Sequence, residues 1–247
     1  MLEDKALSLS RRLLTLANTQ ITIHHQERIP KETSLIVISN HRSILDVPLL
    51  MTAMKRPIRF ACHHFMGQVP GIKQIVNSLG CFPLDSPGQR PQMFFYQGTQ
   101  ILQANESVGI FPEGAQPMIK PELPRQVGSF HRGFAHLALQ ASVPELAILP
   151  VAIIALSETI IPVAPFRLFQ WLAPSEPLFS RPGWHPAVYY RQAHLIIGQP
   201  IWINDSHRAQ YQGRTSKALV KTLTQTCHTQ ISELLIKGRA NTAKPDV

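Results

Sequence analysis

The chain has 247 residues, of which 44% are hydrophobic and only 16% charged. That length accommodates one domain with a sizeable core, and every uninterrupted apolar run is shorter than the roughly eighteen residues of a membrane-spanning helix. The formal net charge of +9 suits an anionic membrane surface or an acidic substrate. The basic residues form no dense stripe with aromatics, which argues against nucleic acid as a partner.

The cysteines and the N-terminal residues indicate the cellular compartment of the protein. Cys62, Cys81 and Cys227 are widely spaced and include no Cys-x-x-Cys pair, which indicates a reducing compartment. Glu3 and Asp4 interrupt the N-terminus, so we expect no secretory signal. These features predict a protein on the cytoplasmic side, associated with the membrane peripherally or monotopically.

The first predicted element is an amphipathic helix within residues 1–20. Leu2, Leu9, Leu13 and Leu16 recur near helical spacing, with basic residues among the polar positions. Two interpretations remain open for this helix. Its apolar face packs on the domain, or it lies in the membrane interface.

Strands are predicted at 21–24 and 35–38, and the segment Asn40–Pro48 follows the second. We expect His41 on the connecting loop and Asp46 at the start of a helix that runs to residue 54. Asp46 then accepts the proton of one ring nitrogen and leaves the other free to act as a base. No serine or cysteine is placed to complete a triad, so the nucleophile would be a substrate hydroxyl. The alternative is a loop histidine that merely adjoins a helix-capping aspartate.

The middle of the chain predicts alternating elements: a strand at 59–62, a helix at 71–79, a helix at 90–105 and a strand at 107–111. Glu113 and Gly114 follow the last strand. The carboxylate suits glycerol-like hydroxyl groups, and the glycine allows a ligand to approach the backbone. Zinc at Cys62, His63 and His64 is disfavoured because consecutive residues share one ion poorly, so we expect no metal.

The remaining predicted elements are a loop at 120–127, a helix at 134–141, a buried strand at 147–154, one or two strands at 187–197, one or two helices at 206–235 and a disordered tail at 239–247. The segment 160–185 is apolar, aromatic and interrupted by prolines, which exclude a long helix. It reads either as a membrane-facing loop or as an irregular segment folded over the domain.

Four motifs carry a resemblance, and they are Asn40–Pro48, Gly80–Asp85, Phe111–Gly114 and Leu149–Val151. From about Glu27 to Val151 the chain resembles the glycerolipid acyltransferase family, which includes the glycerol-3-phosphate and lysophosphatidate acyltransferases. The resemblance implies one acyltransferase domain over 1–247. The expected fold is α/β, with a mixed, mainly parallel-cored sheet flanked by helices, as in glycerol-phosphate acyltransferases.

The resemblance also implies the reaction. An acyl group passes from acyl-coenzyme A or acyl carrier protein to a lysolipid hydroxyl without a cofactor, with His41 as base and Asp46 as its orienting partner. Besides these two, the candidate site residues are those expected to bind substrate: Arg42, Ser43, His63, Glu113, Gly114 and Arg132. His63 stands where the family has a lysine thought to stabilise the oxyanion, and a neutral histidine donates one hydrogen bond but brings no permanent charge.

Two family arginines are replaced, at Ser86 and Gln116. In the family the arginine at the position of Gln116, just after the Phe111–Gly114 motif, holds the acceptor phosphate, which suits a guanidinium and not a neutral amide. Either the phosphate is bound by displaced bases, or the acceptor lacks the phosphomonoester, and the second explanation is favoured. The displaced bases considered are Arg42, Lys120, Arg125 and Arg132.

Two other functional classes compete with acyl transfer. A lipid hydrolase is disfavoured because the sequence contains no Gly-x-Ser-x-Gly nucleophile elbow. A non-catalytic lipid-binding relative is suggested by the altered second and third motifs. Against it, His41, Asp46, Glu113 and Gly114 are all retained.

Overall fold

The computed structural model describes residues 2–63, 66, 72–84, 90–120, 126–172, 174 and 176–242. Several residues discussed above therefore lie outside the described part of the chain, namely His64, Asp85, Ser86 and Arg125.

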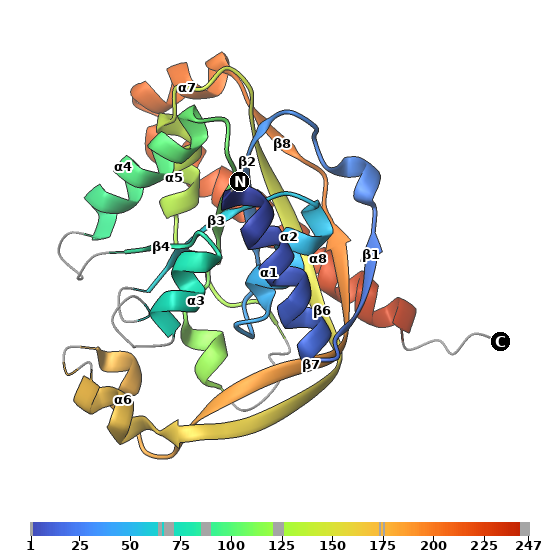
Figure 1. Ribbon diagram of the computed structural model, residues 1–247. Helices are drawn as coiled ribbons and strands as arrows, with labels where there is room; N and C mark the ends of the chain where they lie inside the picture. The colour runs from blue at the N-terminus through green and yellow to red at the C-terminus, as the bar shows by residue number, and fades with distance from the viewer. Residues whose placement is uncertain are drawn as a thin grey trace.

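An eight-stranded sheet forms the centre of the fold (Figure 1), with strand order β1-β7-β6-β2-β5-β3-β4 and β8 paired to β6. The strands are β1 (Gln20–His24), β2 (Ser34–Ser39), β3 (Arg59–Cys62), β4 (Phe82–Pro83), β5 (Val108–Ile110), β6 (Leu146–Pro165), β7 (Trp184–Ile197) and β8 (Ile201–Ile203). β2 is parallel to β5 and β6, and β3 is parallel to β5 and β4. β7 is parallel to β1, whereas β6 runs antiparallel to β7 and β8. The predicted mixed, mainly parallel sheet is confirmed.

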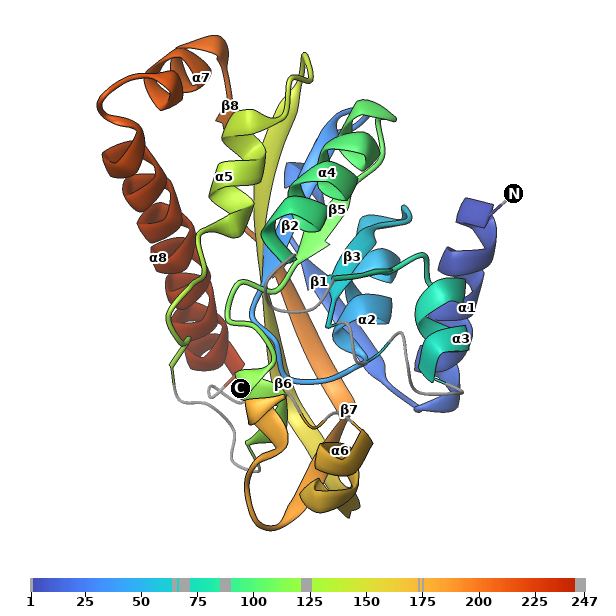
Figure 2. The same ribbon diagram turned by 90° about the vertical axis from the view of Figure 1, so that its left-hand side faces the viewer.

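Helices cover both faces of the sheet (Figure 2). They are α1 (Leu2–Leu16), α2 (Asp46–Met54), α3 (Ile72–Ser78), α4 (Arg90–Gln103), α5 (Gly133–Gln140), α6 (Phe166–Leu172), α7 (Asp205–Gln212) and α8 (Ser216–Thr242), with short 3₁₀ turns η1 (Gln26–Arg28), η3 (Gln116–Ile119) and η4 (Pro177–Phe179). Successive side chains of β2 point to opposite faces. Accordingly, Ile36 and Ile38 pack in the cluster formed with α4, α5 and α8, and Leu35 and Val37 pack in the cluster formed with α1 and α2.

Helix α1 packs on the domain. Ala6 and Leu14 are buried in the cluster shared with α2, and Leu7, Leu9 and Leu13 pack against that cluster. Leu9 and Leu13 of the predicted apolar stripe are therefore used in folding, whereas Leu16 is 84% exposed. The packing of α1 supports the first of the two interpretations of this helix.

The largest departure from the sequence prediction lies between residues 155 and 190. The segment 160–185 was expected to be a loop or an irregular segment, but β6 extends to Pro165 and β7 begins at Trp184, with register shifts between them at 155–158 and 162–164. Residues 158–190 thus form a long two-stranded extension, here called the arm, which carries α6 and η4 at its tip (Figure 1). Pro162 pairs with Pro186, and both strands are outer strands in this part of the described structure, where a missing N–H is tolerated.

Helix α8 completes the fold and extends beyond the predicted closing helix. The tail expected from residue 239 is helical as far as Thr242, and residues 243–247 lie outside the described part. A β-carbon added to Gly238 would lie 2.1 Å from Ile154 Cδ1 and 2.5 Å from Ile196 Cδ1, so the end of α8 packs closely on β6 and β7. No helix in the described residues is both long and apolar enough to cross a bilayer.

Candidate active site

The loop between β2 and α2, residues 40–45, is fastened to the sheet by its first residue. The side-chain amide of Asn40 donates to the Ile153 carbonyl at 2.9 Å and accepts from the Ile153 N–H at 2.8 Å. The loop therefore starts from a fixed point at the carboxyl end of β2, the edge at which ligands bind in open α/β sheets.

His41 and Asp46 meet as the sequence predicted. Nδ1 of His41 lies 2.8 Å from Oδ2 of Asp46, and Asp46 is completely buried. The same Oδ2 accepts the backbone N–H groups of Arg42 and Ser43, at 2.7 and 2.9 Å. The carboxylate thus caps the preceding loop, whereas we expected it to cap the helix. This arrangement gives Nδ1 a fixed acceptor and leaves Nε2 as the acceptor nitrogen of a neutral ring.

The second carboxylate oxygen of Asp46 has a partner from the arm. The Tyr190 hydroxyl donates to Oδ1 at 2.7 Å, and both side chains are buried. Burial, together with the neighbouring Asp46 carboxylate, raises the pKa of Tyr190 well above its usual value. Tyr190 is therefore a permanent hydrogen-bond donor to the carboxylate.

An aromatic stack sets the plane of the His41 ring. The ring lies on Phe111 with centroids 3.9 Å apart and an interplanar angle of 5°, and Phe111 in turn stacks on Phe60 at 5.1 Å. Phe111 directly follows β5, so this contact joins the third predicted motif, Phe111–Gly114, to the first.

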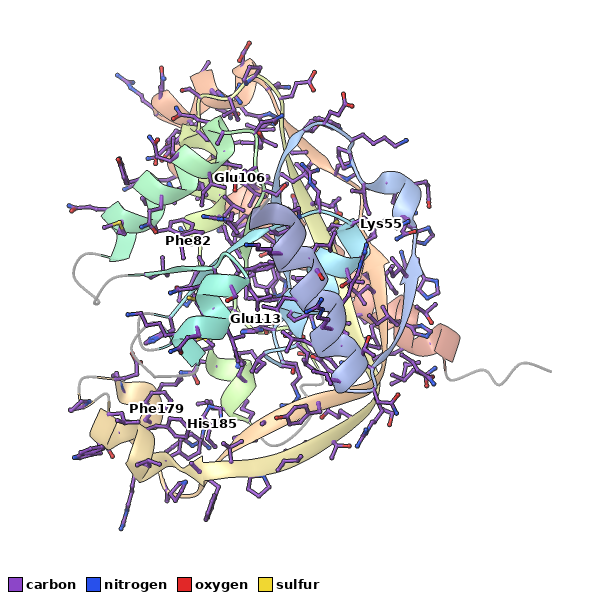
Figure 3. The ribbon with its side chains drawn as sticks, in the orientation of Figure 1. Lys55, Phe82, Glu106, Glu113, Phe179 and His185 are labelled. Carbon is purple, nitrogen blue, oxygen red and sulfur yellow. The ribbon has the colours of Figure 1, made fainter. Side chains whose placement is uncertain are left out.

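Glu113 lies beside the loop of residues 40–45, here called the catalytic loop because His41 is the candidate base. Its Oε1 accepts the His41 backbone N–H at 3.3 Å and its Oε2 accepts the Gly128 N–H at 2.6 Å, with the side chain only 8% exposed. Figure 3 shows Glu113 in the interior, between the sheet and the arm. Gly114 has φ of +68°, a left-handed conformation that glycine adopts without strain, and the His131 ring lies 3.8 Å from where its β-carbon would be.

Arg42 and Ser43 hold the loop in place. Arg42 is 4% exposed and forms an ion pair with Glu158 on β6, with Nη2 and Oε1 2.8 Å apart. Its guanidinium also donates to the carbonyls of Pro117 and Lys120, while the Ser43 hydroxyl donates to the Val188 carbonyl. We predicted substrate contacts for both residues; in the structure their polar atoms bind the protein itself.

His63 and Arg132 do not line the cavity beside His41. Nε2 of His63 lies 2.7 Å from Oε2 of Glu176, which is a buried residue of the arm. Arg132 is exposed where α5 begins. His63 therefore connects the end of β3 to the arm, and the predicted oxyanion contact has no support from its observed partner.

A small cavity adjoins the catalytic loop, with a volume of about 30 Å³. Its lining includes His41, Glu113 and Tyr190 and also, from the end of α8, Leu235 and Arg239.

Sequence reasoning missed Tyr190, Glu158 and Arg239. The first two contact the catalytic loop across 144 and 116 residues of sequence, and no local spacing signals such a contact. Arg239 was assigned to a disordered tail. The continuing helical pattern after Leu235 was the available signal for Arg239.

The cysteines do not provide a nucleophile. Burial raises the pKa of the Cys62, Cys81 and Cys227 thiols to about 12, so each remains protonated at neutral pH. Within the described residues, no group of three histidine, cysteine or acidic side chains is arranged to hold a metal ion.

Comparisons with known proteins agree with this geometry. A protein-family model described as Acyltransferase matches residues 20–154, more than half of the chain. A human protein described as a DGAT1/2-independent enzyme synthesizing storage lipids is 26% identical over 81% of this chain, and a 1-acyl-sn-glycerol-3-phosphate acyltransferase of Borreliella burgdorferi is 23% identical over 42% of it. The chain spans 60% and 42% of the lengths of these relatives.

The fold has a counterpart among solved structures. The crystal structure of the 1-acyl-sn-glycerophosphate acyltransferase PlsC from Thermotoga maritima superposes with a TM-score of 0.58, covering 94% of this chain and 78% of that one at 17% identity. The expected glycerol-phosphate acyltransferase-like fold is therefore confirmed.

Proposed function

This chain belongs to the acyltransferase family, and from that premise we propose that it transfers a fatty acyl group from an acyl thioester to a lipid hydroxyl. The observation that carries the proposal is the His41–Asp46 contact of 2.8 Å, with the carboxylate buried and held by three further donors. A donor of the acyl-coenzyme A or acyl carrier protein type follows from the family resemblance.

The proposed chemistry needs one base and no protein nucleophile. Nε2 of His41 takes the proton of the lipid hydroxyl as its oxygen attacks the thioester carbonyl, and Asp46 stabilises the imidazolium. The tetrahedral intermediate then collapses, the carbon–sulfur bond breaks, and the thiolate takes the proton back from the imidazolium. The ester and the free carrier thiol are the products, so protons and electrons balance without a cofactor.

The acceptor is a lysophospholipid or a related lipid with a free hydroxyl. The Glu113 carboxylate would accept a hydrogen bond from this hydroxyl. A second candidate is an acceptor without a phosphate. Gln116 brings no charge, and the guanidinium of Arg42 is engaged by Glu158 and two carbonyls. The storage-lipid description of the human relative agrees with this candidate.

A radiolabelled acyl-coenzyme A assay against paired acceptors, with and without a phosphate, tests the proposal. Labelled ester is the expected product, and His41→Ala is expected to lower its rate by about 10²- to 10⁴-fold. Free fatty acid as the main product would indicate hydrolysis. Acceptor binding without any product would indicate a lipid-binding relative, and either result would overturn the proposal.

Arg239→Ala separates the two acceptor classes. Besides Arg42, Arg239 is the basic side chain among the described residues that line the cavity. If a phosphorylated acceptor is used, its KM is expected to rise about tenfold in this variant, because a charge-assisted contact is lost. Neutral acceptors are expected to keep their KM, and an unchanged KM for both classes would remove Arg239 from acceptor recognition.

The reaction joins two molecules that carry fatty chains. We therefore infer that the protein works at a membrane surface, bound peripherally or monotopically on the cytoplasmic side, and that anionic lipids favour binding because the chain has a net charge of +9.

A further inference from the structure

The tip of the arm exposes an unusual concentration of large apolar side chains. Trp171 is 75% exposed, Trp184 58% and Val163 54%. Further exposed apolar residues of the same segment are Ile161, Leu168 and Leu172. An exposed apolar surface of this kind marks an interaction site, whereas single exposed residues elsewhere are ordinary.

The tip is nevertheless folded. Phe166 and Phe179 are buried with Ile119 in a small core of their own. The His185 ring lies against Phe166 and Phe169, with centroid distances of 5.5 and 5.0 Å. Figure 3 shows Phe179 and His185 side by side inside the tip. The exposed residues are therefore presented on an ordered surface.

The charges around this surface are positive. Arg167 and Arg181 are exposed, and Arg181 lies 5.2 Å above the Phe166 ring. Glu176, the acidic residue of the tip, is buried beside His63. Aromatic and aliphatic residues rimmed by arginine match the interface of an anionic bilayer, where indole rings lie at headgroup level.

The root of the arm reaches the catalytic loop. Glu158 pairs with Arg42, the Val188 carbonyl accepts from Ser43, and Tyr190 donates to Asp46. The arm therefore projects from the same end of the sheet at which His41 lies (Figures 1 and 2). A lipid surface that contacts the tip lies on the catalytic side of the molecule.

We propose that the tip of the arm, residues 160–184, inserts into the headgroup region of an anionic membrane and seats the catalytic edge of the sheet against the lipid. Helix α1 offers a smaller apolar surface, because Leu9, Leu13 and Leu14 pack on the domain and Leu16 is exposed by itself. The proposal names the docking surface for the membrane association inferred above. Vesicle binding is measured without turnover, so its outcome is independent of the proposed reaction.

The chain offers an internal control, since its three tryptophans are Trp171 and Trp184 on the arm and Trp202 on β8. Three variants, each with a single tryptophan and phenylalanine at the other two positions, are mixed with vesicles of phosphatidylcholine and phosphatidylglycerol containing brominated acyl chains. Trp171 and Trp184 are expected to shift their emission to the blue and to be quenched, and Trp202 is expected to do neither. Quenching of Trp202 alone, or of all three equally, would overturn the proposal.

Binding strength provides the second measurement. Trp171→Ala combined with Trp184→Ala is expected to weaken vesicle binding about tenfold or more, and Trp202→Ala to leave it unchanged. Arg167→Gln is expected to weaken binding to anionic vesicles about fivefold and to have little effect on pure phosphatidylcholine.

Three results would overturn the assignment: no vesicle binding by the parent protein, equal effects of the Trp171/Trp184 and Trp202 variants, or self-association through the tip in place of lipid binding. Turnover of a water-soluble short-chain acceptor is expected to be unchanged in the double arm variant, which checks that the catalytic loop is intact.

Discussion

The catalytic loop and the tip of the arm both depart from the usual rule that apolar side chains are buried and charged ones exposed, but they depart from it in opposite ways. The loop buries charged and polar groups, with Arg42 and Asp46 almost completely shielded from solvent. The tip exposes tryptophan, leucine and valine. Buried polar groups are tolerated where each has a partner, and exposed apolar groups are unfavourable in water until something covers them.

The two regions therefore differ in what their structure must provide. The loop needs a single geometry, which it obtains from hydrogen bonds contributed by β6, β7 and the segment after β5. The tip needs a surface, and its small aromatic core is sufficient to present one. Tyr190 and Glu158 belong to the arm and contact the catalytic loop. The geometry of the loop therefore also depends on the root of the arm.

The largest expected effect comes from removing the charge within the loop. Asp46→Asn retains the shape of the side chain and an oxygen for Nδ1 of His41, but it removes the negative charge that faces the imidazolium. We expect kcat to fall by about 10³-fold with the circular dichroism spectrum unchanged. A loss below tenfold would mean that the carboxylate is structural and not catalytic.

A smaller effect is expected at the point where the two regions meet. Tyr190→Phe removes the donor to Oδ1 of Asp46 and leaves a buried carboxylate oxygen without that bond, so kcat is expected to fall about tenfold with little change in KM.

The matched control is Tyr189→Phe, because Tyr189 is the neighbouring residue and is exposed. It is expected to change neither kcat nor KM. Equal losses of kcat in both variants, or a rise in KM without a loss of kcat in Tyr190→Phe, would contradict a positioning role for Tyr190.

The smallest effect is a pH dependence confined to the tip. Burial among aromatic rings lowers the pKa of His185 from its ordinary value of 6.5. The neutral ring is thus favoured in the folded tip. The contribution of neutral His185 to the stability of the folded tip is complete above about pH 6.5. This contribution is lost as the pH falls from 6.5 toward the lower pKa that His185 has in the folded state.

Emission from a variant with Trp184 as its sole tryptophan, followed between pH 7 and pH 5, measures this change. Acid is expected to shift the emission to the red, and His185→Phe is expected to remove most of the shift. The opposite trend, a tip that tightens in acid, would contradict the assigned cause.

The sequence predicts most of the longer elements as far as Ile154, because each of these has the periodicity of its type. β2 and the first half of β6 are continuous apolar runs, and α4 and α5 carry apolar residues at helical spacing. β4 and β8 escape prediction because two or three residues carry no recognisable period. The arm escapes it because its prolines indicate breaks in regular structure, although an outer strand accommodates them.

The contacts of the site likewise fall into those that local sequence predicts and those that it does not. His41 and Asp46 are five residues apart, so a local motif predicts their contact, and Glu113 follows from the end of the neighbouring strand. Tyr190 and Glu158 are brought to the loop only by the antiparallel return of β7 along β6. Local residue spacing does not predict this antiparallel pairing of β7 with β6. The contacts that fasten the loop are therefore visible only in the folded structure.

The pairing of Asn40 with Ile153 imposes a chemical condition on the whole site. A carboxamide presents N–H donors and a carbonyl acceptor in one plane, as a peptide group does, so the Asn40 side chain extends the ladder between β2 and β6 beyond the last register pair, Ser39 and Val151. Hydrolysis of this one carboxamide to a carboxylic acid, as happens to asparagine in ageing proteins, would set a carboxylate oxygen against the Ile153 carbonyl. The enzyme would lose the anchor of its catalytic loop while every other atom stayed in place.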